Sequence, residues 1–303
     1  MRIHHVVLAA GVWALAIGSL LAEPPKAQAM TREEFEAKLG YKTGKVTLLD
    51  GAATIDLPES FRYLDAEGSR RLLVEGWGNP PESATGVLGM LVPSSVSPLD
   101  PAGWGIVITY DEQGYVNDKD AASIDYAKML KEMQDATVAA NDERKKAGFA
   151  PVTLVNWAEP PSYNAATHKL YWAKELSFGD APEHTLNYNI RILGRRGVLV
   201  LNAVAAMGQL PDIRKQTGDL LATVNFNEGH RYTDYLPGKD KAAAYGIGGL
   251  IVGAAAAKAG LFKLLWVGIL AFKKLIVVGF AALVATLKKW FGKKKQAEQP
   301  TTA

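Results

Sequence analysis

The chain contains 303 residues, of which 34 are Lys or Arg and 31 are Asp or Glu, giving a formal net charge of +3. Apolar residues make up 48% of the chain, which excludes a wholly disordered or collagen-like protein. There is no cysteine, so a disulfide framework, a thiol nucleophile and a Cys-ligated metal site are excluded as well.

The first 29 residues have the pattern of an export signal. A short basic start precedes an apolar run of 17 residues at 6–22, and small residues at 27–29 offer a cleavage site, with residues 20–22 as a second one. The run is shorter than the roughly 20 residues that cross a bilayer, which favours a cleaved signal over an uncleaved anchor. We therefore expect residues 30–241 to form a domain outside the cytoplasm.

The exported part begins with short elements. Thr31 and Glu34 form a capping box, which predicts a helix that ends at Gly40. Asp50-Gly51 lies between two strand-like runs and predicts a hairpin. A weak helix is then expected at 66–75, and strands at 87–92 and 104–110.

The strongest helix prediction starts after Asp118 or Asp120 and runs to about Lys146, because apolar residues recur there at helical spacing. Strands are expected next at 152–157, 168–178, 185–193 and 198–206, then a helix from Pro211 and a short strand at 224–226. Strands in hairpin order with a few helices predict an α+β fold, a mostly antiparallel sheet flanked by helices. The order of elements, and only the order, resembles that of the PsbP-like sandwiches.

Two segments join a tryptophan to a stiff proline pair. Such a pair supplies a flat apolar surface on a preset backbone, which is typical of peptide, glycan or protein recognition. The alternative is that each Trp packs inward while the prolines stiffen the exit of a strand. The candidate binding residues are Trp77, Asn79, Pro80 and Pro81 in the first segment and Trp157, Glu159, Pro160 and Pro161 in the second.

No catalytic motif is present, and we expect neither a metal nor a cofactor. The domain's three histidines are too scattered for a metal-binding pair on one helical turn, and there is no H-E-x-x-H, G-x-S-x-G or phosphate-binding loop. The acidic stretch at 111–120 lacks EF-hand spacing, so its Asp residues are interpreted as helix caps. A hydrolase that pairs Asp111 with His168 or His184 is the enzymatic alternative.

The C-terminal part predicts a membrane attachment. Residues 30–241 carry 23 basic and 29 acidic side chains, a net charge of −6, whereas residues 242–303 carry nine Lys and one Glu, a net charge of +8. We expect an anchoring helical region at 242–291 and a basic, then polar, end at 292–303. The residues predicted to form the anchor are the small-xxx-small series Gly249, Gly253 and Ala257, which favours self-association in lipid, and Lys258, Lys263, Lys273 and Lys274.

The lysines decide how this segment meets the bilayer. A lysine at the bilayer centre costs about 2.5–3.5 kcal/mol on insertion scales, which disfavours a span centred on Lys273 and Lys274. A span at about 246–265 followed by a second apolar segment or a cationic surface helix is favoured, and a hairpin and a pore-lining helix are the alternatives. The basic cluster after residue 287 favours a cytoplasmic C-terminus, and hence an inner-membrane protein with its domain in the periplasm.

Several separated motifs resemble a family of uncharacterised Gram-negative membrane-anchored proteins that carry a domain of unknown function. The motifs are GWGNPP (76–81), GMLVP (89–93), WGIVITYDEQGYVNDKDA (104–121), LVNWAEPPSYNAATHKLYWAKEL (154–176), LNYNIRILGRRGVLVLNAVA (186–205) and VNFNEGHRYTDYLPGKDKAAAYGIGGLI (224–251). The resemblance implies an envelope location and a C-terminal anchor, and it brings no catalytic residue.

The function predicted from these features is a non-enzymatic binding or scaffolding module held at the inner membrane. Its expected partners are the lipid bilayer and an envelope protein, peptide or glycan, with no nucleic acid. An envelope hydrolase is the first alternative. The second is a protein that perturbs or senses the membrane through its cationic tail.

Overall fold

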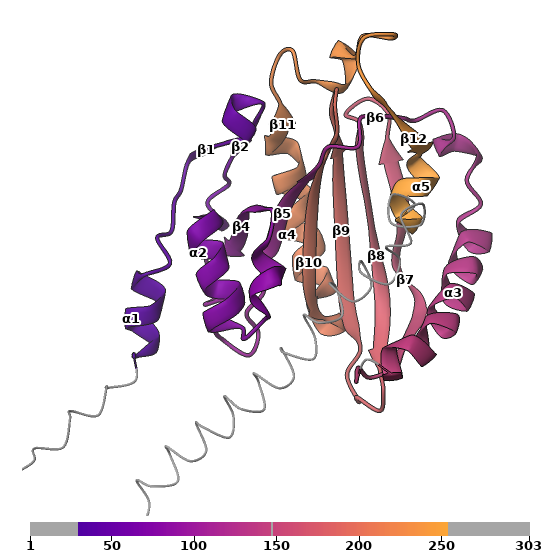
Figure 1. Cartoon of the computed structure of the whole chain (residues 1–303). Helices are drawn as coiled ribbons and strands as arrows, with labels where there is room; N and C mark the ends of the chain where they lie inside the picture. The colour runs from indigo at the N-terminus through magenta and orange to yellow at the C-terminus, as the bar shows by residue number, and fades with distance from the viewer. Residues whose placement is uncertain (1–29, 147, 254–303) are drawn as a thin grey trace, which may run out of the picture.

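A computed structural model of the chain describes residues 30–146 and 148–253. Its central element is a seven-stranded sheet in which every neighbouring pair is antiparallel (Figure 1). In spatial order the strands are β3 (Phe61–Asp65), β4 (Val87–Pro93), β5 (Ile106–Asp111), β10 (Val198–Ala206), β9 (Thr185–Leu193), β8 (Lys169–Phe178) and β7 (Val152–Asn164). The predicted α+β class with a mostly antiparallel sheet is confirmed.

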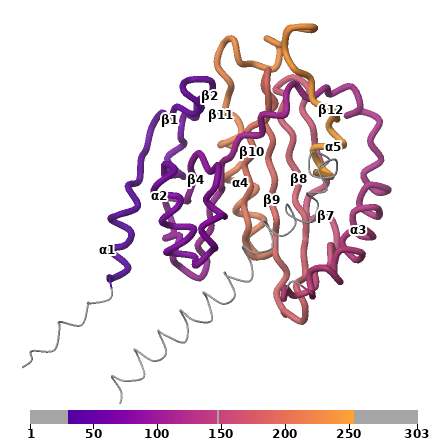
Figure 2. Tube along the Cα trace, viewed as in Figure 1, coloured from indigo at the N-terminus to yellow at the C-terminus, as the bar shows by residue number. Residues whose placement is uncertain are grey.

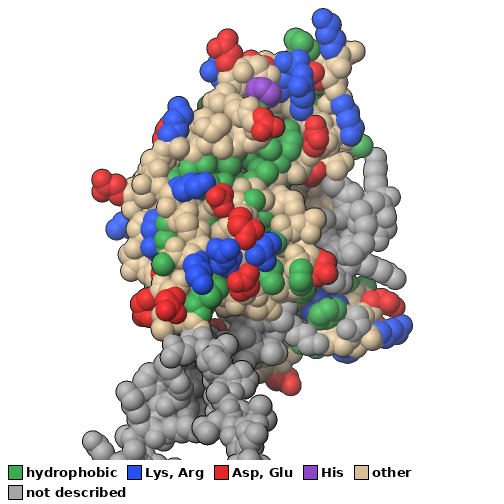
Figure 3. All heavy atoms as spheres, turned by 60° about the vertical axis from the view of Figure 1, so that its left-hand side comes forward, with side chains coloured by type: hydrophobic (Ala, Val, Ile, Leu, Met, Phe, Trp, Pro, Cys, Tyr) green, Lys and Arg blue, Asp and Glu red, His purple; other side chains and the backbone are tan. Residues whose placement is uncertain are grey.

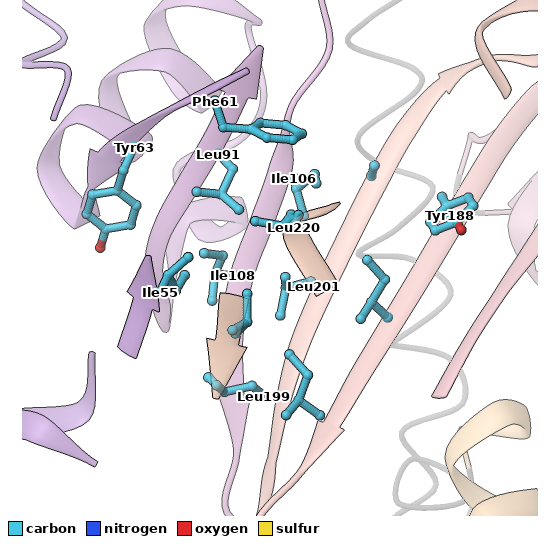
Figure 4. Packing of buried hydrophobic residues seen from close by; sticks show 14 of the residues in the cluster. Ile55, Phe61, Tyr63, Leu91, Ile106, Ile108, Tyr188, Leu199, Leu201 and Leu220 are labelled. Atoms are coloured by element: carbon cyan, nitrogen blue, oxygen red, sulfur yellow. The ribbon is translucent and has the colours of Figure 1, made fainter. Parts of the chain in front are cut away.

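A small sheet and one helix cover one face of the large sheet. They are β1 (Lys45–Leu48), β2 (Ala53–Asp56), β11 (Val224–Phe226) and α4 (Leu210–Thr223). Ile55, Leu201 and Leu220 are fully buried between the layers, in the largest apolar cluster of the described residues (Figure 4). The alternation of apolar residues along β5, β9 and β10 sets which face is buried there, because successive side chains of a strand point to opposite sides.

Helices cover the other face at its two edges (Figure 2). Leu72 and Leu73 are fully buried against β3 and β4, and Met133 packs against β7 and β8. The helices are α1 (Arg32–Ala37), α2 (Ala66–Arg70), which continues into a π-helical turn (Arg71–Gly76), and α3 (Tyr126–Lys146). Short 3₁₀ turns link the elements at Leu49–Gly51, Pro81–Ala84, Ala121–Ser123, Met207–Gln209 and Tyr232–Asp234.

The predicted helix at 118–146 begins later than expected, at Tyr126. Asp125 accepts hydrogen bonds from the backbone N–H groups of Ala127 and Lys128 and therefore begins the helix. Asp120 does cap a helix, but a different one: its carboxylate accepts from the N–H groups of Ile247 and Gly248 at 2.9 and 3.0 Å. A capping residue in the sequence does not reveal which helix it serves when the partner is more than a hundred residues away.

The folded domain continues past residue 241, where the sequence predicted its end. β12 (Ala242–Gly246) pairs in parallel with β6 (Tyr115–Asn117), and α5 (Ile247–Val252) follows. Ile247 and Ile251 are buried against Trp172 and its neighbours. The apolar run that was predicted to be an anchor therefore begins in the protein core. A run of Ala, Gly and Ile has the same composition in a core and in a bilayer, so the sequence does not distinguish the two.

The predicted anchor residues divide at Gly253. Gly249 lies in α5, and Gly253 ends α5 in the left-handed conformation (φ 84°) that favours glycine. Among the described residues, no helix is long and apolar enough to cross a membrane. The anchor predictions for Ala257, Lys258, Lys263, Lys273 and Lys274 lie outside the described residues.

Candidate functional site

The first Trp-Pro-Pro segment is tied to the domain by its side chains. The indole N–H of Trp77 donates to the carbonyl of Pro98 at 2.8 Å. Asn79 is 3% exposed, and its amide donates to the carbonyl of Leu73. Pro80 precedes a 3₁₀ turn, and Pro81 is exposed, beside a shallow depression of about 460 Å³ that Glu67 and Arg70 also line. Trp77 and Asn79 thus hold the loop in place.

Ion pairs surround that depression. Arg70 bridges Glu67 and Glu75, and Arg71 also contacts Glu67, all on partly or fully exposed side chains. Figure 3 shows one face of the molecule, on which acidic and basic side chains are interspersed. Exposed pairs of this kind contribute little to stability and give the surface no dominant sign of charge.

The second Trp-Pro-Pro segment lies within β7, which continues beyond the strand predicted at 152–157. Pro160 and Pro161 are tolerated because β7 is the edge strand and its ladder shifts register there. The indole N–H of Trp157 donates to the carbonyl of Tyr126 at 3.1 Å, at the start of α3. Glu159 pairs with Arg214 of α4 at 3.3 Å.

The two segments do not form one surface. Trp77 follows the helical turn packed against β3 and β4, whereas Trp157 lies on β7, at the other edge of the seven-stranded sheet. The strands β5, β10, β9 and β8 lie between β4 and β7. The two strands are therefore five spacings apart, which is roughly 24 Å at about 4.8 Å per spacing. A single ligand bridging both would have to cross the sheet.

The side chains of the enzymatic alternative are also apart. Asp111 on β5 lies level with Val198 on β10 and Leu193 on β9, and the N–H of Leu193 bonds to the carbonyl of His168. Three strand spacings, about 14 Å, therefore separate Asp111 from His168. His184 precedes β9 at the opposite end of the sheet and pairs with Glu175 at 2.6 Å. Neither predicted Asp–His pair forms.

A cluster of aromatic rings around His168 is one feature that the sequence did not predict. The rings of Tyr235, Tyr115, Tyr232 and His168 stack in series, with centroids 3.9, 4.5 and 4.0 Å apart. The hydroxyl of Tyr163 donates to Asp118 at 2.7 Å and lies 3.1 Å from Nδ1 of His168. These residues come from three separate stretches of the chain, 115–118, 163–168 and 232–235.

The hydrogen bonds assign the tautomer of His168. The carboxylate of Asp118 only accepts, so it takes the single hydroxyl proton of Tyr163. Nδ1 of neutral His168 must then carry the ring proton and donate to the Tyr163 oxygen. Burial lowers the pKa of His168 below its usual value, and the charge of Asp118 opposes this shift.

His168 is therefore expected to weaken the fold in acid. Because its folded-state pKa lies below 6.5, the unfolded chain binds a proton first as the pH falls, and the free energy of unfolding decreases below that pH. The measurement is urea unfolding at about pH 7.5 and about pH 5.5 for the wild type and for His168→Asn, since Asn tolerates the left-handed backbone (φ 52°) of this position. The variant should lose less stability on acidification.

The control for this experiment is His184→Asn, which removes an exposed histidine paired with Glu175. Both variants remove one histidine, but His168 is the one that packs among Tyr163, Tyr232 and Asp118, where burial lowers its pKa. Equal pH dependence in the wild type and in His168→Asn would contradict the assignment.

A second unpredicted feature is a row of polar side chains on the helix-covered face of the large sheet. We name it the polar strip and define it as Lys174, Asn187, Asn189, Arg191 and Asn202. The register places Lys174 opposite Asn187, and places Trp172, Asn189 and Asn202 in one line across three strands. Lys174, Asn187 and Asn189 are only 8%, 2% and 3% exposed, whereas Arg191 and Asn202 stay partly exposed. Such burial of polar groups in a sheet face is unusual for a core.

Arg191 lies at one end of the polar strip and contacts two of its asparagines. Its Nη1 donates to the carbonyl of Ile190 at 2.8 Å and to Oδ1 of Asn202 at 3.0 Å, and Nη2 lies 3.4 Å from Oδ1 of Asn189. The guanidinium carbon is 4.9 Å from the ring centroid of Trp172, a cation–π geometry. Backbone, amide and indole together hold the planar group in one orientation.

Burial in the polar strip disfavours the charged forms of Lys174 and Arg191. Burial, together with the nearby charge of Arg191, lowers the pKa of Lys174 to about 8. Burial lowers the pKa of Arg191 to about 10, partly opposed by Asp111, and raises the pKa of the Asp111 carboxyl. The hydroxyl of Tyr245 reaches Asp111 at 3.4 Å. Among the described residues, Asp111 is the carboxylate that opposes the lowered pKa of Arg191.

One sequence signal could have found the polar strip. The segment 186–193 alternates Asn187, Asn189 and Arg191 with the apolar Tyr188, Ile190 and Ile192. On an ordinary half-exposed strand this alternation indicates a solvated face. That both faces of β9 are covered follows only from the packing of other elements against it.

Comparisons with known proteins give one family. The family described as "Protein of unknown function (DUF2167)" matches residues 40–284. No curated protein matches the chain.

Three solved structures share a low similarity with the chain. PsbP from Synechocystis sp. PCC 6803 is 9% identical over 60% of this chain and 91% of its own, with a TM-score of 0.35. The Ran-binding protein Mog1p of Saccharomyces cerevisiae is 12% identical over 61% and 96%, with a TM-score of 0.33. LpqN of Mycobacterium tuberculosis, described as involved in cell envelope biogenesis, is 16% identical over 64% and 95%, with a TM-score of 0.29. At these scores they assign no ligand or partner to this chain.

Proposed function

The chain belongs to the DUF2167 family of proteins of unknown function, and we propose that it is a binding module anchored in the inner membrane of the cell envelope. In this proposal the domain faces the periplasm and the C-terminus lies in the cytoplasm. The domain binds a ligand and catalyses no reaction on it.

The observation that carries the proposal is the way the domain holds the start of the predicted anchor. α5 is buried through Ile247 and Ile251, its first N–H groups are bound by Asp120, and β12 before it pairs with β6. The chain passes from this site directly into the apolar, lysine-containing stretch at 254–291. A firm junction of this kind supports a domain that works at a defined distance from the membrane.

The placement of the polar groups favours binding over hydrolysis. Asp111 is distant from His168 and His184, so the general base that a hydrolase would need is not assembled from these residues. The polar strip, in contrast, brings five hydrogen-bonding side chains from three strands onto one face. Convergent polar groups on a rigid sheet are typical of a ligand site.

Cysteine labelling of intact cells tests the topology. Single Cys variants at Val138, which is 65% exposed on α3, at Leu261 and at Ala303 are treated with a membrane-impermeant maleimide. The chain has no native cysteine, so each signal belongs to one site. Val138→Cys should react in intact cells and Ala303→Cys only after lysis.

Two other outcomes are informative in the same experiment. Equal labelling of Val138→Cys and Ala303→Cys in intact cells would refute a single net crossing and favour a hairpin. Recovery of the protein in the soluble fraction after cell breakage would refute the anchor itself. Leu261→Cys reports which side of the membrane the start of the tail occupies.

A further inference from the structure

We propose that Asp118, Tyr163 and His168 form a metal site that binds a ferric ion. The ligand atoms are Oδ2 of Asp118, the hydroxyl oxygen of Tyr163 and Nδ1 of His168. The proposal goes beyond the proposed function, because neither the predicted anchor nor the polar strip takes part in this site.

The first observation is the spacing of the three atoms. The hydroxyl oxygen of Tyr163 lies 2.7 Å from Oδ2 of Asp118 and 3.1 Å from Nδ1 of His168, and these last two atoms are 3.7 Å apart. Ligands about 2.1 Å from one metal ion are about 3.0 Å apart at right angles and about 3.4 Å apart at tetrahedral angles. The three atoms therefore have the spacing of one face of a coordination shell.

The fold brings the three ligands together from three segments. Tyr163 lies at the end of β7, His168 directly precedes β8, and Asp118 directly follows β6. Oδ1 of Asn164 accepts hydrogen bonds from two backbone N–H groups of the turn between Tyr163 and His168, which holds both ligands in place. In the ranges that the structure describes, no three His, Asp or Glu side chains converge on one point, so this site depends on a tyrosine as its third ligand.

The second observation is the charge of Asp118. In the described part of the chain no Lys or Arg lies within 4.0 Å of its carboxylate, and burial lowers the pKa of its partner His168. Asp240, in contrast, pairs with Arg195 at 2.6 Å. A partly buried carboxylate is stabilised by a cation, and a metal ion would supply the one that Asp118 lacks.

The third observation is the hydroxyl of Tyr232. Its ring stacks on that of His168 with centroids 4.0 Å apart, and the side chain is only 7% exposed. Burial raises the pKa of this hydroxyl, and the nearby Tyr115 and Asp118 raise it further. Among the described residues the hydroxyl has no hydrogen-bond partner. An unpaired buried hydroxyl is costly, and a water molecule on the metal ion would pair with it.

The ligand set favours a ferric ion. Imidazole suits zinc, copper, iron and nickel, whereas anionic oxygen atoms suit hard cations. Burial and Asp118 raise the pKa of Tyr163, so its hydroxyl keeps the proton in the metal-free protein. Only an ion of high charge displaces that proton, because a bound cation must outweigh the raised pKa.

Solvent reaches the site. The side chains of His168 and Asp118 are 21% and 26% exposed, so water can take the remaining positions around the ion. On binding, Tyr163 releases its hydroxyl proton to solvent, and the ring proton of His168 passes from Nδ1 to Nε2. The phenolate and the carboxylate then offset two of the three positive charges of the ion.

The test uses the untagged full-length protein in nonionic detergent, after treatment with a chelator. Ferric ion is added as its nitrilotriacetate complex while visible absorption is recorded, because a phenolate bound to ferric ion gives a charge-transfer band. The band should saturate when ion and chain are equal in amount, and Tyr163→Phe should abolish it. Asp118→Asn should weaken the affinity at least about tenfold, since even residues that only orient a metal ligand are worth this much.

Two variants are the matched controls. Tyr235→Phe removes a hydroxyl from the far end of the same ring stack, and His184→Asn removes a histidine that pairs with Glu175. Both should keep the band and the affinity of the wild type. Thermal unfolding accompanies each variant. If Tyr163→Phe does not fold, Asp118→Asn decides, because its amide oxygen still accepts the hydrogen bond of Tyr163.

The outcomes are distinct. Absence of the band, an equal band in Tyr163→Phe, or unchanged affinity in the folded Asp118→Asn variant overturns the proposal. Displacement of the ferric ion by an equal concentration of Zn²⁺ overturns the assignment to iron. None of these results depends on topology, so the labelling experiment can fail or succeed independently.

Discussion

Replacing Ile247 with alanine is expected to lower the free energy of unfolding by about 2–4 kcal/mol, the usual cost of truncating a buried isoleucine. Ile247 is fully buried at the start of α5, in the cluster that contains Trp172 and Tyr232. The measurement is urea unfolding of the full-length protein in detergent, followed by tryptophan fluorescence.

The control is Val138→Ala, which also shortens an aliphatic side chain in a helix. Val138 is 65% exposed on α3, so the free energy of unfolding of this variant should differ from that of the wild type by no more than about 0.5 kcal/mol. If Ile247→Ala were equally silent, α5 would not be part of the folded domain. The firm junction between domain and anchor would then be lost, and with it the main support for the proposed function.

Replacing Trp157 with alanine is expected to cost about 2–4 kcal/mol, somewhat less than a fully buried Trp because the ring is only partly buried. Trp157 packs between α3 and β8 and fastens the start of α3 through its indole N–H. Trp157→Phe keeps the ring and should lose about 1 kcal/mol, the typical net worth of one hydrogen bond. Thermal and urea unfolding measure both variants.

This prediction separates the two interpretations of the Trp-Pro-Pro segments. A recognition loop would tolerate Trp157→Ala with unchanged stability and lose a co-purified envelope partner. If Trp157 packs inward, Trp157→Ala would lower the stability of the protein, and any loss of a partner would follow from unfolding. Pro160→Ala is the matched control within the segment, since Pro160 is exposed on the edge strand and its loss should leave stability nearly unchanged.

Local signals in the sequence predicted the elements well. The capping box at Thr31 and Glu34 forms as expected, and the hairpin around Asp50-Gly51 joins β1 to β2. The antiparallel pair β9 and β10 occupies the ranges predicted for its two strands, 185–193 and 198–206. Each of these depends on residues close together in the chain, so the pattern and its cause lie in the same window.

The candidate site could not be predicted in the same way. The cluster around His168 forms only because the end of β7, the start of β8, β6 and the segment after β11 lie near one another. These segments bring His168 together with Asp118, Tyr163 and Tyr232. The candidate residues chosen from the sequence were aromatic and proline-rich, and two of them, Trp77 and Trp157, hold backbone carbonyls instead. A single sequence shows which side chains can recognise a ligand, but not which of them the fold uses for packing.

Composition and local periodicity were enough to predict the class of fold, the division of charge and the apolar C-terminal stretch. The packing of distant segments was needed to show that the stretch begins inside the domain, that Asp120 caps a helix 127 positions away, and that Arg191 lies on the helix-covered face of the large sheet. The physical reason is that burial and charge compensation depend on what packs against a residue. For Arg191, Asn202 on β10 and Trp172 on β8 contact the side chain, and the residues next to 191 in the sequence indicate neither contact.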